Sequence, residues 1–220
     1  MERNDLSTGL RRLAIGTTIA SAMTFVTSVF QNLSESLSGS AGILVNLLVL
    51  PAGIASLVAS IIYLMGLALL YQEHRSYLHS FVCTLAGGIL VALGAVPFLG
   101  TALVLAGVVL EVLGNFLLIR ATNAVIARAA RGLRLAPLGW AVWWLGLSGI
   151  LLSSSAVLLA LFPISVGGLM ASLAFLVLST VLSLATLVCR IVYFWRAYQV
   201  SLDLLHAEGG GVLPPGQAGA

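Results

Sequence analysis

Charged residues are scarce in this sequence, and their scarcity excludes a water-soluble globular domain. Only 8% of the 220 residues are charged, 60% are hydrophobic, and the mean hydropathy is +1.12. A soluble domain has about 25% charged and about 45–50% apolar residues. Water could not solvate the surface that this composition leaves, whereas lipid could. We therefore predict an integral protein of the cell membrane, in contact with the lipid bilayer.

Lysine is absent, cysteine is rare, and familiar catalytic motifs are missing. All ten positive side chains are arginines, scattered over segment ends without interleaved aromatic residues, which argues against a nucleic-acid partner. Cys83 and Cys189 lie within apolar runs without adjacent histidines, so we predict neither a disulfide framework nor a zinc site. No phosphate loop, HExxH or GxSxG occurs. We expect no cofactor, no metal and no enzymatic activity; an intramembrane enzyme is the least favoured alternative.

Six apolar stretches are long enough, or nearly so, to cross a bilayer, which requires about 20 helical residues each. These stretches are residues 13–34, 43–71, 80–98, 101–119, 138–162 and 167–195. They predict an all-α fold, a polytopic membrane helix bundle with six transmembrane helices over residues 13–206. Residues 1–12 would precede the bundle as a cytoplasmic segment, and the Gly/Pro-rich residues 207–220 would follow it as a disordered cytoplasmic tail.

Two of these stretches have features that affect how they cross the membrane. The first is rich in Thr and Ser, whose hydroxyls can bond to the carbonyl four residues earlier and so be tolerated in lipid. Pro51 divides the second stretch. It either kinks one long helix or marks the true helix start, in which case residues 43–50 lie re-entrant or at the interface.

The distribution of arginine predicts the orientation. Nine arginines lie before the first stretch, in alternate connections or after the sixth stretch: Arg3, Arg11, Arg12, Arg75, Arg120, Arg128, Arg131, Arg134 and Arg196. The other three connections contain no arginine and one acid, Glu35. Because cytoplasmic loops carry the excess of positive charge, both termini should be cytoplasmic.

One connection, residues 120–137, repeats alanine and arginine at helical spacing. It predicts a cytoplasmic extension of the fourth span, ended by Gly132 and Pro137. Its arginines either only anchor the topology or also meet anionic lipid headgroups.

Weak internal similarity suggests three repeated helical hairpins. YLMGLALLYQ (63–72) aligns without gaps on EVLGNFLLIR (111–120) and on RIVYFWRAYQ (190–199). The alignment places Tyr63, Glu111 and Arg190 at one equivalent position, although the matches are few and chance remains an alternative.

Glycine recurs at an interval of seven residues, which predicts close helix packing. The recurrences are Gly100, Gly107 and Gly114, then Gly87 and Gly94, then Gly139 and Gly146. Small residues along one stripe let helix backbones approach in lipid.

Glu111 and Arg190 are the only charged residues inside the predicted spans, and they have opposite charge. Arg190 lies six residues before Arg196, or roughly 9 Å deep, from where an arginine can reach the headgroups. Glu111 lies nine residues before Arg120, or roughly 13 Å deep, and its shorter side chain needs a partner or water. We predict that the two groups face each other across the fourth and sixth spans.

The neighbours of this pair complete a candidate substrate-binding site. Asn115 lies one helical turn from Glu111, Tyr193 lies three residues from Arg190, and Tyr63 could join from the second span. The cluster either binds a small solute or exchanges a proton, or it only locks the helices together.

Two functions therefore stay open. The first is a small-solute transport or solute-binding component that works as a homo-oligomer or with partner membrane subunits. The second is a non-catalytic membrane scaffold or regulatory subunit in which the Glu/Arg pair is only structural. In helix count and size alone, the chain resembles the substrate-binding subunits of vitamin-uptake transporters, and no motif contributes to that resemblance.

Overall fold

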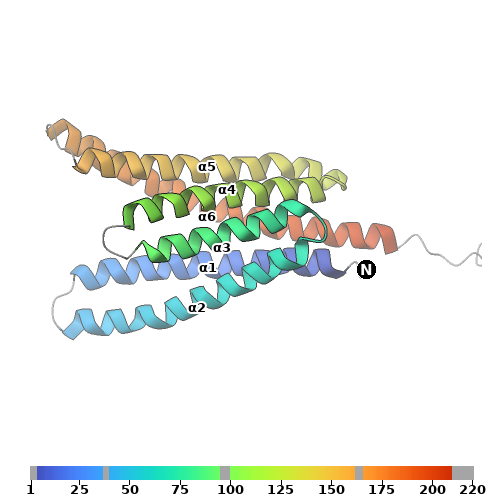
Figure 1. Cartoon of the computed structure of the whole chain (residues 1–220), viewed down its shortest axis with the longest axis horizontal. Helices are drawn as coiled ribbons and strands as arrows, with labels where there is room; N and C mark the ends of the chain where they lie inside the picture. The colour runs from blue at the N-terminus through green and yellow to red at the C-terminus, as the bar shows by residue number, and fades with distance from the viewer. Residues whose placement is uncertain (1–3, 37–39, 95–99, 162–165, 210–220) are drawn as a thin grey trace, which may run out of the picture. The chain divides into compact units, whose positions relative to one another are not determined.

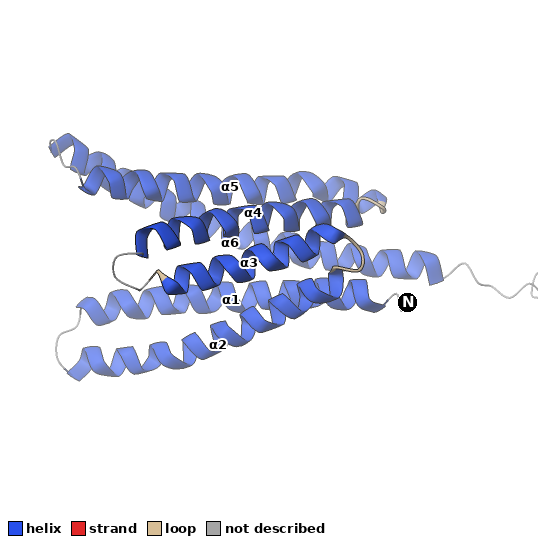
Figure 2. Cartoon of the chain, viewed as in Figure 1, coloured by secondary structure: helices blue, strands red, loops and turns tan. Residues whose placement is uncertain are grey.

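The computed structural model describes residues 4–36, 40–94, 100–161 and 166–209, and almost all of these residues are α-helical. In these residues there are six helices and no strand (Figures 1 and 2). The helices are α1 (Asn4–Ser36), α2 (Ser40–Leu70), α3 (Arg75–Leu93), α4 (Gly100–Ile126), α5 (Ala130–Leu161) and α6 (Val166–Gly209). The predicted all-α class is confirmed.

Most of these helices are long and apolar enough to cross a bilayer. Among the described residues there are five such stretches, namely Pro51–Leu70, Arg75–Leu93, Ala102–Ile126, Arg131–Ala156 and Met170–Leu205. Large apolar side chains face outward along them: Val109 is 65% exposed, Leu151 59% and Val177 62%. Extended apolar surface of this kind requires lipid rather than water. The chain is a helical membrane protein, as its composition predicts.

Helix α1 is not among the five apolar stretches, so the sixth span stays a prediction. Two of its threonine hydroxyls bond as expected for a helix in lipid. The hydroxyl of Thr18 donates to the carbonyl of Ala14 at 2.8 Å, and that of Thr24 donates to the carbonyl of Ala20 at 2.9 Å. These bonds satisfy the side chains within the helix and lower the cost of placing them in hydrocarbon.

Helix α2 runs without interruption from Ser40 to Leu70 and contains Pro51. Residues 43–50 are therefore helical and continuous with the following span, and Pro51 does not begin the helix.

The prediction for residues 120–137 is wrong in one respect. Helix α4 ends at Ile126, and both Gly132 and Pro137 lie inside α5 rather than ending an extension of α4. Tight backbone bonds close the turn, including Arg128 N–H to the Val125 carbonyl at 3.4 Å and Ala129 N–H to the Ile126 carbonyl at 3.0 Å. Alanine and arginine favour helix on either side of a turn, so the sequence cannot place the reversal.

The helices group into two compact units, which we describe separately. The first unit comprises residues 1–78 and 194–220, and the second comprises residues 79–193. In the first unit, α1 packs along α2. Its core consists of fully buried side chains: Leu10, Leu13, Leu67, Leu70, Tyr77 and Phe194.

In the second unit, small residues hold α3 and α4 together, as the glycine recurrence predicts. The hydroxyl of Ser80 donates to the carbonyl of Gly114 at 2.8 Å. A Cβ atom at Gly107 would lie 2.8 Å from the carbonyl oxygen of Gly87, so only hydrogen fits there. Toward the α3–α4 connection, Gly94 and Gly100 make a similar close approach. The absence of side chains along this seam lets the two backbones touch.

Close contacts made by glycine and other small residues of one helix also set the register of each hairpin. The pairs are Gly9 with Gly66 and Gly16 with Ala59 in α1–α2, Ser80 with Gly114 and Gly87 with Gly107 in α3–α4, and Gly139 with Tyr193 and Gly146 with Thr186 in α5–α6. Within each helix these positions are seven residues apart. When the three hairpins are aligned on these contacts, Gly66, Gly114 and Tyr193 occupy the same position in their hairpins. Each lies three residues after Tyr63, Glu111 or Arg190, so the contacts support the alignment found in the sequence.

Candidate functional site

Glu111 lies in the middle of the apolar part of α4 and packs its side-chain stem against α3. A Cβ atom at Gly87 would lie 3.0 Å from the Cγ of Glu111, so the missing side chain at Gly87 makes room for this stem. Glu111 is nevertheless exposed overall. The stem is therefore positioned by the α3–α4 seam, while the residue as a whole stays accessible from outside this seam.

Arg190 brings a positive charge to this carboxyl group from α6. It lies within electrostatic range of Glu111 and is half-buried. Both residues belong to the second unit. The structure thus places opposite charges of α4 and α6 near each other in an apolar part of the protein, where their attraction is stronger than in water.

Asn115 supports the same stretch of α4 rather than extending toward Arg190. Its side-chain amide donates to the backbone carbonyl of Glu111 at 2.9 Å. This bond within one helical turn fixes the Asn115 side chain beside Glu111.

Tyr193 is fully buried one turn from Arg190, and its partner is a residue that the sequence did not single out. Its hydroxyl donates to the side-chain oxygen of Asn123 at 2.7 Å. The Asn123 amide in turn donates to the backbone carbonyl of Ala136 at 3.2 Å. These bonds join α4, α5 and α6 at one level. The only sequence signal was an asparagine close to the end of the fourth apolar stretch.

Gly139 makes space for this hydrogen-bonded group. A Cβ atom there would lie 2.8 Å from Cε2 of Tyr193 and 2.9 Å from Oδ1 of Asn123. The glycine recurrence in the fifth stretch did identify Gly139, but not the side chains that fill the space beside it.

Tyr63 belongs to the first unit, apart from the other four candidate residues. It packs on α1, where a Cβ atom at Gly16 would lie 2.9 Å from its Cβ. The equivalence of Tyr63 with Glu111 and Arg190 is therefore one of position within a hairpin, and its place in the site stays a prediction.

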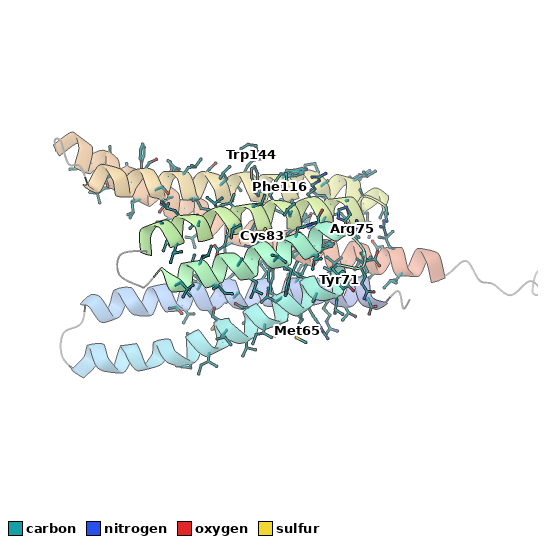
Figure 3. All side chains as sticks on the ribbon, viewed as in Figure 1. Met65, Tyr71, Arg75, Cys83, Phe116 and Trp144 are labelled. Carbon is teal, nitrogen blue, oxygen red and sulfur yellow. The ribbon has the colours of Figure 1, made fainter. Side chains whose placement is uncertain are left out.

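An aromatic cluster borders the polar residues in the second unit. The ring centroids of Phe116 and Trp143 are 5.4 Å apart, those of Phe116 and Trp140 are 5.5 Å apart, and those of Trp143 and Trp144 are 4.8 Å apart. Trp144 projects outward from α5 (Figure 3). Tryptophan is enriched in membrane proteins where a helix passes the membrane–water interface.

Among the described residues, no group of histidine, cysteine and acidic side chains could hold a metal ion. Cys83 and Cys189 are both free thiols and half-buried.

Comparison of the chain with protein-family models, with curated protein sequences and with solved structures finds no match. The fold and the site define a class in physical terms: a helical membrane protein with a pair of opposite charges inside its apolar helices. The carboxylate can accept hydrogen bonds or a proton, and the guanidinium can pair with an anionic group.

Proposed function

We propose that this protein is a non-catalytic membrane component that binds or transports a small solute, with Glu111 and Arg190 forming the polar site. The observation that carries the proposal is the environment of Glu111. Its stem is held by Gly87 while the side chain remains exposed, and Arg190 supplies a nearby positive charge.

The exposure of Glu111 separates this proposal from a purely structural pair. A dry ion pair that only locks helices together would be enclosed by neighbouring side chains. An exposed carboxylate inside an apolar span instead needs water, a solute or another protein beside it, because lipid solvates it poorly.

The chemistry of the pair limits what the site could hold. A small molecule carrying both a positive and a negative group would complement the carboxylate and the guanidinium, and a proton could exchange on the carboxylate. Orientation is part of the same proposal: the arginine distribution supports cytoplasmic termini. A homo-oligomer or partner membrane subunits would cover the remaining apolar surface.

The second candidate is a scaffold or regulatory subunit in which the pair fixes helix positions. The bonds from Tyr193 through Asn123 to Ala136 favour this reading, because they join three helices through polar groups that bond to one another.

Three variants distinguish the two functions: Glu111→Gln, Arg190→Gln and the double variant. The full-length protein would be purified in a mild detergent and studied by native mass spectrometry, to detect a co-purifying small molecule, and by thermal unfolding. For a solute site, Glu111→Gln should lose the bound molecule while its unfolding midpoint stays within about 2 °C of the wild type.

Glu73→Gln, which removes an acid at the α2–α3 turn, is the matched control and should retain the molecule. The opposite result would favour the scaffold. In that case both single variants would lose several degrees of stability, the double variant would recover it, and no bound molecule would depend on Glu111.

A further inference from the structure

Four arginines gather where α4 meets α5, and all four are exposed. Arg120 lies in the last part of α4, Arg128 in the turn, and Arg131 and Arg134 in the first part of α5. We call these four residues the arginine collar. No acidic residue occurs in the sequence between Glu111 and Asp203, so all the charged side chains of residues 112–202 are arginines.

One hydrogen bond between α4 and α5 shows where the collar lies along these two helices. The bond from the Asn123 amide to the Ala136 carbonyl places these two residues at the same level of α4 and α5. Arg120 lies three residues before Asn123, and Arg134 two residues before Ala136, so each is within about 5 Å of that level. Arg128 and Arg131 lie closer to the turn.

Farther from the turn than Arg128, Arg131 and Arg134 lies the aromatic cluster of Phe116, Trp140, Trp143 and Trp144, with Arg120 near the level of Trp140. Trp140 is six residues from Arg134 along α5, or about 9 Å farther from the turn. Exposed aliphatic side chains follow, with Leu151 59% exposed. Arginine, then tryptophan, then aliphatic surface is the order of a membrane leaflet from phosphate through interface to hydrocarbon.

An apolar side chain stands among the arginines. Leu133 is 62% exposed although it lies between Arg131 and Arg134. A surface that served only soluble partners would have no need of an exposed leucine there. Beside lipid, leucine can contact acyl chains near the headgroups while the arginines contact phosphates.

We propose that the arginine collar binds the headgroup phosphates of anionic phospholipids, with Leu133 and the aromatic cluster contacting the same lipids. Guanidinium groups suit phosphate because they donate two parallel hydrogen bonds. This proposal does not depend on the function of Glu111 and Arg190.

The test compares anionic and neutral lipid on the full-length protein. The purified protein would be mixed with vesicles of phosphatidylglycerol and phosphatidylcholine, and the lipids it retains would be counted by native mass spectrometry. Wild-type protein should retain phosphatidylglycerol in preference to phosphatidylcholine. Arg131→Gln combined with Arg134→Gln should weaken phosphatidylglycerol binding on the order of tenfold.

The matched control is Arg75→Gln combined with Arg196→Gln, which removes two exposed arginines outside the collar and should leave the preference unchanged. Salt provides a measurement on the unaltered chain, since retention of phosphatidylglycerol should fall steeply as salt is raised. Equal retention of the two lipids, equal losses in the two double variants, or displacement by inorganic phosphate alone would each overturn the proposal.

Discussion

At the scale of single residues, the sequence identified the charged pair but not the asparagine that bonds to Tyr193. Glu111 and Arg190 stand out in the sequence because charges are rare in apolar runs, and the structure places them within electrostatic range. Asn123 does not stand out, because asparagine near the end of a span is ordinary. Its importance comes from meeting Tyr193, which is 70 residues away in the chain.

The bond between Tyr193 and Asn123 leads to a first prediction. Tyr193→Phe keeps the buried ring but removes the donor, leaving the Asn123 oxygen without this bond in a buried place. The free energy of unfolding should fall by about 1 kcal/mol, near the usual range for hydrogen bonds between membrane helices. Thermal unfolding in detergent measures the change.

Tyr71→Phe is the control for this prediction, because Tyr71 is 46% exposed. It should change stability by less than about 0.5 kcal/mol. Equal effects of the two substitutions would show that the buried hydrogen bond contributes nothing of its own.

At the scale of helices, the recurrence of glycine predicts the packing well. A seven-residue interval keeps small residues on one side of a helix, and that is how Gly87, Gly107 and Gly114 form the seam between α3 and α4. Helix ends were harder to predict. The sequence did not show whether residues 127–137 extend α4 or begin α5. In the structure, a turn separates the two helices, and Ile126 and Leu135 are buried on either side of it.

The seam gives a second prediction, which compares two glycines of the same hairpin. In Gly107→Ala, the new Cβ would lie 2.7 Å from Val91 Cγ2 and 2.8 Å from the Gly87 carbonyl oxygen. Because one obstacle is backbone, the helices must move apart, and stability should fall by about 1–3 kcal/mol.

Gly88→Ala is the matched control, because nothing lies within 4 Å of a Cβ at that position. It should be neutral or stabilising by up to about 1 kcal/mol, since alanine favours helix over glycine. Unfolding of both variants under one set of detergent conditions makes the comparison. Similar losses in both would mean that the seam does not require close backbone contact.

At the scale of the whole molecule, the number of spans determines where the termini lie. Five stretches of the described residues qualify as spans by length and composition, and none of them lies in α1. Yet α1 packs along α2 through Gly9 and Gly16, and the hydroxyls of Thr18 and Thr24 bond within the helix. These features suit a helix that crosses the membrane beside α2.

A third prediction follows from counting crossings. If α1 spans, six crossings place both termini on one side, and the arginine distribution makes that side cytoplasmic. A green fluorescent protein fused to either end should then fluoresce, while alkaline phosphatase fused to either end should be inactive. Activity of alkaline phosphatase at only one terminus would instead indicate an odd number of crossings and remove α1 from the spans.

The sequence by itself determined the class of this protein, its helix count and its candidate charges. These follow from composition and from the length of apolar runs, because a helix in lipid satisfies its own backbone without help from the rest of the chain. Tertiary structure alone decided which polar groups meet, where α4 ends, and that Glu111 is exposed while Tyr193 is buried. Contacts of that kind join residues distant in sequence, and their strength depends on how closely two helix surfaces fit.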